Sequence, residues 1–195
     1  MATTEKLQKA YSLFDAANEK DPNKEEYQGK TYAKEVLYAI RMTNKLNAFA
    51  PNASEALQLT ARCQHICRWE IPRSDYPMDR IGYLKWREEL KKFHATKASE
   101  ILEKVGYSSE IIDRVSFLIQ KKKLKKDEDT QTLEDVICLV FLTFYYPEFS
   151  TKHPDGKVID ILQKTWRKMS DKGQKTALQL SHSGKALILL QEALS

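Results

Sequence analysis

The sequence predicts an all-α fold, a single domain over residues 1–195 with about seven to nine helices. Apolar residues recur with a period near 3.6 along almost the whole chain. Only 6 Gly and 6 Pro occur in 195 residues, whereas all-β and doubly wound folds use many of both in turns. Hydrophobic residues make up 42% and charged residues 30% of the chain, a globular balance that excludes a disordered or fibrous protein.

In the N-terminal half, helices are expected wherever this period runs between breaker residues. Asp21-Pro22-Asn23 ends the first helix, Pro51 ends the second, and Gly106 follows the fourth. The spacing of Asn52 and Glu55 predicts a capping box at the start of the third. The expected helices cover the residues before 21 and about 30–50, 54–69 and 80–105, with a proline-containing loop at 72–79.

In the C-terminal half, Ser108 caps a fifth helix with Val115 and Leu118 on its core face. The lysine-rich run 121–126 interrupts the pattern and is interpreted as a solvated connection, because it lacks aromatic residues and acidic residues follow it. The next helix, 132–149, is apolar nearly all round and must be central. The last expected helices cover about 157–169 and one or two short segments that end at Leu194.

Charge and cysteine content limit the classes of function. The chain has 32 Lys and Arg against 27 Asp and Glu, a net charge of +5, which falls short of a dedicated nucleic-acid binder. No apolar run approaches the roughly 18 residues of a membrane span, and the N-terminus lacks the apolar core of a signal peptide. Three cysteines do not form a disulfide framework, so we expect a cytoplasmic protein without a membrane partner.

No phosphate-binding glycine loop, nucleophile elbow or Cys-x-x-Cys pair is present, so the candidate chemistry depends on side chains from separate helices. His65 and His94 lie within amphipathic segments, Glu35 in the second helix, and Asp135 at the start of the most apolar helix. Helical bundles build metal sites from such ligands, so a divalent ion (Mn, Mg, Fe or Zn) is one interpretation. The alternative is that the histidines are hydrogen-bonded core residues.

The segment RCQHICRWEIPRSDYPMDRIGYLKWR, residues 62–87, continued by Phe93-His94-Ala95, resembles the domain-of-unknown-function family 4202. The segments QTLEDV at 131–136 and KTWRKMS at 164–170 are similar to that family as well. The resemblance extends over almost the whole chain, and the family itself has no known function.

The order of elements also resembles the HD-domain superfamily of helical, metal-dependent phosphohydrolases, which implies a compact HD-like helical domain. By this resemblance His65 matches the histidine of the His-Asp doublet and Asp135 the late aspartate. His94 matches an auxiliary histidine, and Glu35 takes the place of the first histidine. The resemblance therefore implies a divalent metal ion held by these four residues.

One position departs from the HD pattern. The aspartate of the doublet is Ile66 in this chain. Glu70, five residues after His65, could replace that carboxylate only if the end of the helix is distorted. With a metal bound, Asp135 and Glu70 would be the catalytic residues that activate water for attack on a phosphoryl group.

Phosphate recognition is expected from arginines close to His65, because the guanidinium fork binds phosphate in a bidentate manner. The candidates for substrate binding are Arg62, Arg68 and Arg73, with Trp69 to stack a base. The alternative is that they form surface salt bridges and core contacts.

Three functions remain open. The first is a metal-dependent phosphohydrolase that acts on a nucleotide or other small phosphate ester. The second is a degenerate HD-like module that binds a phosphorylated ligand without catalysis, which the missing aspartate favours. The third is a basic helical protein that associates with RNA. A small phosphorylated ligand is the expected partner in the first two cases.

Overall fold

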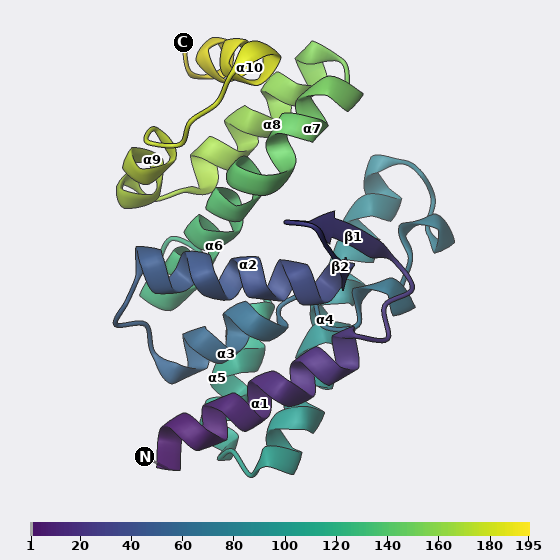
Figure 1. Ribbon diagram of the computed structural model, residues 1–195, viewed down its shortest axis with the longest axis vertical. Helices are drawn as coiled ribbons and strands as arrows, with labels where there is room; N and C mark the ends of the chain where they lie inside the picture. Colours follow the sequence, from purple (N-terminus) through teal and green to yellow (C-terminus); the bar gives the residue numbers. More distant parts are fainter. Residues whose placement is uncertain (1) are drawn as a thin grey trace. The chain divides into compact units, whose positions relative to one another are not determined.

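The computed structural model describes residues 2–195, which form ten α-helices, one β-hairpin and three short helical segments of other types (Figure 1). The all-α prediction is confirmed, with slightly more helices than expected. In chain order the elements are α1 Ala2–Asn18, β1 Lys24–Tyr27, β2 Lys30–Ala33, α2 Lys34–Phe49, α3 Glu55–Cys63, η1 Arg68–Glu70, η2 Arg73–Asp75, α4 Arg80–Val105, α5 Ser109–Ile119, α6 Glu128–Val140, η3 Phe141–Tyr145, α7 Tyr146–Lys152, α8 Asp155–Lys168, α9 Asp171–Ala177 and α10 Gly184–Leu194.

The chain divides into two compact units, Met1–Lys122 and Lys123–Ser195, called unit 1 and unit 2 below. Each unit has its own buried apolar side chains, among them Phe14 and Leu59 in unit 1 and Leu139 and Tyr146 in unit 2. The expectation of a single domain over residues 1–195 stays a prediction.

Within unit 1, α1, α2 and α3 pack on one another, and α4 packs on α5 and α1 (Figure 1). The hairpin between α1 and α2 was not predicted. Its two-residue turn is Gln28-Gly29, with φ of +51° and +74°, values that suit a tight hairpin turn and favour glycine. Because β2 takes residues expected in the second helix, α2 begins at Lys34.

Asp21 joins the hairpin to the start of α2. Ala33, the N-cap residue, offers no side-chain hydrogen bond, and Asp21 Oδ2 accepts the Glu35 N–H instead, at 3.2 Å. Asp21 Oδ1 accepts the backbone N–H of Asn23 at 2.9 Å. Asp21 thus replaces the missing cap and fixes the first turn of α2, where Glu35 lies.

The third helix is shorter than predicted, because α3 ends at Cys63 and the expected end was near Trp69. Residues 64–67 form a turn in which Cys67 has a left-handed backbone, φ +53° and ψ +32°. Its N–H donates to Oδ1 of the buried Asn18 at 2.9 Å. This turn redirects the chain, so His65 and Arg68 do not lie on a continuous helix.

The expected helix over 80–105 is confirmed as α4. Asp79 caps its N-terminus by accepting the Gly82 N–H at 2.7 Å, and Gly106 ends it in the left-handed conformation with φ +88°. The buried face of α4 includes Trp86, Leu90 and His94.

In unit 2 the apolar segment expected as one helix over 132–149 has three parts. The helix α6 begins earlier, at Glu128, and passes at Phe141 into a π-helical segment, η3, that leads to α7. The turn of π-helix rotates the residues after it relative to those before it, which a simple 3.6 period does not predict. Leu133, Val136 and Leu139 of α6 are fully buried, as expected for a central helix.

None of the helices in the described part of the chain, residues 2–195, combines the length and the hydropathy that a membrane-crossing helix requires.

Candidate functional site

Four segments of unit 1 bring four polar side chains together. Glu35 comes from the first turn of α2, His65 from the turn at 64–67, Arg68 from the start of η1, and His94 from α4. Glu35 Oε2 lies 3.4 Å from His65 Nδ1, and the rings of His65 and His94 are 5.9 Å apart between centroids. Arg68 Nη1 lies 3.3 Å from His65 Nε2. We call these four residues the Arg68 cluster.

The tautomer of His94 follows from its hydrogen bond. His94 Nδ1 lies 2.7 Å from the carbonyl oxygen of Ile66, which can only accept, so Nδ1 carries the proton and Nε2 a lone pair. Arg68 Nη1 lies 3.3 Å from Nε2 and 3.5 Å from Nδ1 of His65, so this contact does not assign the tautomer of His65.

Burial sets the protonation of both imidazoles. It lowers the pKa of His94 to about 3, helped by the nearby His65. It also lowers the pKa of His65 well below 6.5, and the charges of Arg68, Lys121, Arg87 and Lys34 lower it further. Both rings are therefore neutral near pH 7. The same cations create a positive potential at His65, whose side chain is 25% exposed.

Glu35 is the only carboxylate of the cluster, and its side chain is 9% exposed. Burial raises the pKa of Glu35, an effect opposed by the charge of Arg68. The 3.4 Å contact with His65 is not a hydrogen bond, and Oε2 is buried without a hydrogen-bond partner among residues 2–195. The carboxylate therefore has unused hydrogen-bonding capacity beside His65.

Arg68 is the candidate arginine with free capacity for an anion. Its guanidinium makes a cation–π contact with Trp86, with Cζ 5.0 Å from the ring centroid. No carboxylate pairs with it within the part of the chain that the structure describes. A guanidinium in a cation–π contact retains N–H donors, and such donors bind phosphate oxygens.

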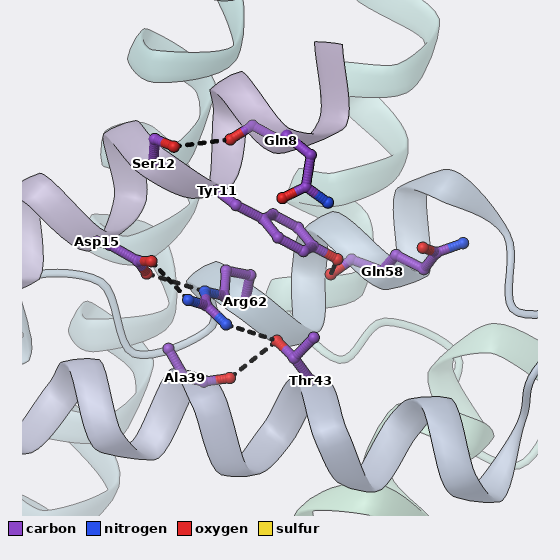
Figure 2. Close-up of polar contacts among 8 residues, drawn as sticks. All are labelled: Gln8, Tyr11, Ser12, Asp15, Ala39, Thr43, Gln58 and Arg62. Carbon is purple, nitrogen blue, oxygen red and sulfur yellow. Dashed lines mark hydrogen bonds and ion pairs between the residues drawn. The ribbon is translucent and has the colours of Figure 1, made fainter. Parts of the chain in front are cut away.

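Arg62, also predicted to bind substrate, is engaged inside unit 1 (Figure 2). It connects α3 to α1 through two bonds with Asp15, Nε–Oδ1 at 2.8 Å and Nη2–Oδ2 at 2.5 Å. Nη1 lies 3.4 Å from Thr43 Oγ1 of α2, and the guanidinium lies over the Tyr11 ring. Arg62 has the contacts of a packing residue, and we leave it out of the site.

Arg73 is similarly engaged. It donates to the backbone carbonyl oxygens of Tyr76, Pro77 and Asp79 at 2.9, 2.6 and 3.2 Å, and so fixes its own loop. That loop, with the start of α4, lines a hollow of about 590 Å³. The residues that line it include three carboxylates, Glu70, Asp75 and Asp79, and one cation, Lys85. This hollow does not have the charge that a phosphate would need.

Asp135 lies in unit 2, at the junction of α6 and α9. Its Oδ1 accepts the Ser170 N–H at 2.8 Å and the Gln131 amide at 3.1 Å, and Oδ2 accepts the Ser170 hydroxyl at 2.5 Å. Ser170 in turn caps α9. A Cβ added at Gly173 would lie 2.6 Å from Asp135 Oδ1, which shows how closely α9 packs on this carboxylate.

Glu70 and Trp69 lie in η1. The helix end is distorted, the condition under which Glu70 could replace the missing aspartate, but Glu70 Oε2 pairs with Lys97 Nζ at 3.3 Å. Trp69 is half-buried next to it. Ile66, at the position of that aspartate, is fully buried, and its carbonyl oxygen binds His94.

A metal ion does not fit the cluster as its residues lie. Within residues 2–195 no three or more His, Cys, Asp or Glu side chains are arranged to hold a metal ion. The Arg68 cation lies 3.3 Å from Nε2 and 3.5 Å from Nδ1 of His65, so a positive charge already stands beside both nitrogens that a metal could use.

Two further aromatic residues lie at the site, and the sequence did not single out the first of them, Tyr38. Tyr38, one turn after Glu35 on α2, stacks on His65 with centroids 4.2 Å apart and planes at 13°. Trp86 supports Arg68 and donates from Nε1 to the Ile71 carbonyl oxygen at 2.9 Å. Tyr38 could have been found from its i, i+3 spacing to Glu35, which places both side chains on the same face of the helix.

Comparison with curated proteins and with solved structures gives no match. One family does match, described as Domain of unknown function (DUF4202), over residues 8–190. This match includes every residue of the Arg68 cluster and nearly all of both units. The chain belongs to the family of proteins that contain the domain of unknown function DUF4202.

Proposed function

We propose that unit 1 binds a small phosphorylated ligand at the Arg68 cluster without hydrolysing it. One observation carries this proposal: Arg68 has no carboxylate partner among residues 2–195, and it lies where the surrounding cations depress the pKa of His65. A phosphate would supply the missing negative charge. Arg68 would bind its oxygens through charge-assisted hydrogen bonds, with His65 and Tyr38 as the flat wall beside it.

The charges and the hydrogen bonds support binding rather than turnover. Two neutral imidazoles and a buried carboxylate, with no set of metal-holding side chains in the described chain, leave no group arranged to activate water with a metal. Ile66 in place of the doublet aspartate agrees with this.

The test is calorimetric titration of the full chain with adenosine 5′-monophosphate and with glycerol 1-phosphate. Arg68→Ala should weaken both affinities at least tenfold, because about 1.5–3 kcal/mol is typical for a hydrogen bond to a charged group.

The matched control is Arg80→Ala, which removes the same charge from an exposed residue in the first turn of α4. It should change either affinity less than about twofold. Equal losses in the two variants would show only general attraction of anions to a basic chain. No binding to the wild-type chain would contradict the proposal.

Metal-dependent hydrolysis, with the HD-like fold and the ligands implied by it, is the second candidate. It is favoured by His94, whose Nδ1–H binds a backbone carbonyl oxygen as the second nitrogen of metal-ligating histidines commonly does. Elemental analysis of protein purified without chelators, and release of phosphate from the two esters, test it. Stoichiometric metal that is lost in His94→Gln, together with turnover, would replace the binding proposal.

We further propose a reducing compartment, such as the cytoplasm, for this chain. The buried free thiols of Cys63, Cys67 and Cys138 support it. RNA association through the 121–126 segment stays a prediction, tested by a steep dependence of RNA affinity on salt.

A further inference from the structure

The Arg68 cluster contains a buried carboxylate oxygen that a bound phosphate group would leave without a hydrogen bond. Glu35 Oε2 is buried, has no hydrogen-bond partner among residues 2–195, and belongs to a side chain that is more than nine-tenths buried. A buried polar atom in this condition costs free energy unless a ligand or water satisfies it.

Geometry places this atom next to the proposed phosphate site. Glu35 Oε2 and Arg68 Nη1 lie 3.4 and 3.5 Å from the same atom, His65 Nδ1. A ligand held by Arg68 would therefore have its neighbouring atoms close to Glu35. The phosphate itself cannot contact an ionised carboxylate favourably, since the two are both negative.

We propose that Glu35 binds a hydroxyl group located beside the phosphate of the ligand, so that the site selects hydroxylated phosphate esters, such as sugar phosphates or nucleotides, over simple alkyl phosphates. This inference rests on the proposed function. A hydroxyl both donates and accepts, so it satisfies Oε2 whether the carboxyl group is ionised or neutral. His94 Nε2, which carries a lone pair, is a second acceptor in the same cluster.

The choice of a hydroxyl over an ammonium group follows from charge. Arg68, Lys34, Lys121 and Arg87 all act on His65, which Glu35 contacts. An added cation would be repelled by these groups, whereas a neutral hydroxyl would not.

The test compares two probes of equal charge and carbon number, glycerol 1-phosphate and propyl phosphate, by calorimetry with the full chain. The wild-type chain should bind the glycerol ester about tenfold more tightly. Glu35→Leu should lose this preference while it keeps affinity for propyl phosphate.

The outcomes distinguish failure of hydroxyl recognition by Glu35 from failure of phosphate binding at Arg68. If both esters bind equally to the wild-type chain, or if the preference survives in Glu35→Leu, the inference is wrong and phosphate binding stands. If neither ester binds, or Arg68→Ala binds as well as wild type, the proposed function itself fails. The wild-type comparison needs no variant, so it decides the inference even if Glu35→Leu does not fold.

Discussion

At the scale of single residues, the environment decides which candidates can take part in a site. Arg62, Arg68 and Arg73 look alike in the sequence, yet Arg62 is paired with Asp15 and Arg73 is bonded to three carbonyl oxygens of its loop. Only their partners, which are distant in sequence or set by the loop conformation, distinguish them. Arg68 is set apart because, among residues 2–195, neither a carboxylate nor a carbonyl oxygen accepts a hydrogen bond from its guanidinium.

His94 gives a prediction about pH. Its pKa is about 3 in the folded chain and ordinarily 6.5, so the unfolded chain binds more protons between these values. The stability contributed by the neutral ring is complete above pH 6.5 and is lost as the pH falls toward 3. From pH 7 to pH 5 we expect a loss of about 2 kcal/mol in the free energy of unfolding from His94.

Urea denaturation at several pH values measures this loss. Burial also lowers the pKa of His65 and His182, so the wild-type decrease contains their contributions with the same sign. The His94→Gln variant should therefore show a shallower decrease than wild type. A decrease of the same depth in both would mean that His94 is not held neutral.

At the scale of elements, the turn after α3 positions the site. Cys67 is left-handed and buried, and its N–H is held by Asn18 of α1. A non-glycine residue in this conformation costs free energy, and such strain often occurs at functional sites. The short helix α3 and this turn, rather than a continuous helix, place His65 and Arg68 beside Glu35.

Cys67→Val should destabilise the chain by more than about 2 kcal/mol and weaken phosphate binding, because a β-branched residue disfavours a left-handed backbone. Cys67→Gly should stay within about 1 kcal/mol of wild type, since relief of strain offsets the lost thiol contacts. Thermal and urea denaturation measure both. Cys138→Val, a buried cysteine in the regular helix α6, is the control and should cost less than about 1 kcal/mol. Equal stability of the two valine variants would contradict the role of this turn.

The junction of α6 with α9 gives a second prediction at this scale. Asp135→Asn replaces a carboxylate oxygen that accepts hydrogen bonds with an amide that donates, facing Ser170. We expect a loss of about 2 kcal/mol in stability, unchanged by a chelator. Asp160→Asn, at an exposed pair with Lys164, is the control and should stay within about 0.5 kcal/mol. If Asp135→Asn is as stable as wild type but removes a bound metal, Asp135 is a ligand and not a structural residue.

At the scale of the whole molecule, the helical period was sufficient for the fold class and for long helices with clear ends, such as α4 between Asp79 and Gly106. The helical period failed to predict the secondary structure where a tertiary contact or an unusual backbone conformation determines it. The hairpin at 24–33 has too few apolar residues to show strand alternation, and Asn18 interrupts the third helix from outside it. The sequence selected three members of the Arg68 cluster as metal ligands, but the charge around them could not be predicted before Arg68 was placed.

The most direct test of the central claim follows the imidazole nitrogens of the full chain by nuclear magnetic resonance, with 15N-labelled histidine, as glycerol 1-phosphate is added. The chain has four histidines, of which His65 and His94 lie in the Arg68 cluster. We predict saturable shifts of the His65 and His94 ring nitrogens, with those of His153 and His182 unchanged. Binding of a phosphorylated ligand at Arg68 would be contradicted if the chain is saturated with glycerol 1-phosphate while the His65 ring nitrogens keep their chemical shifts. Equal shifts at all four histidines would contradict it as well.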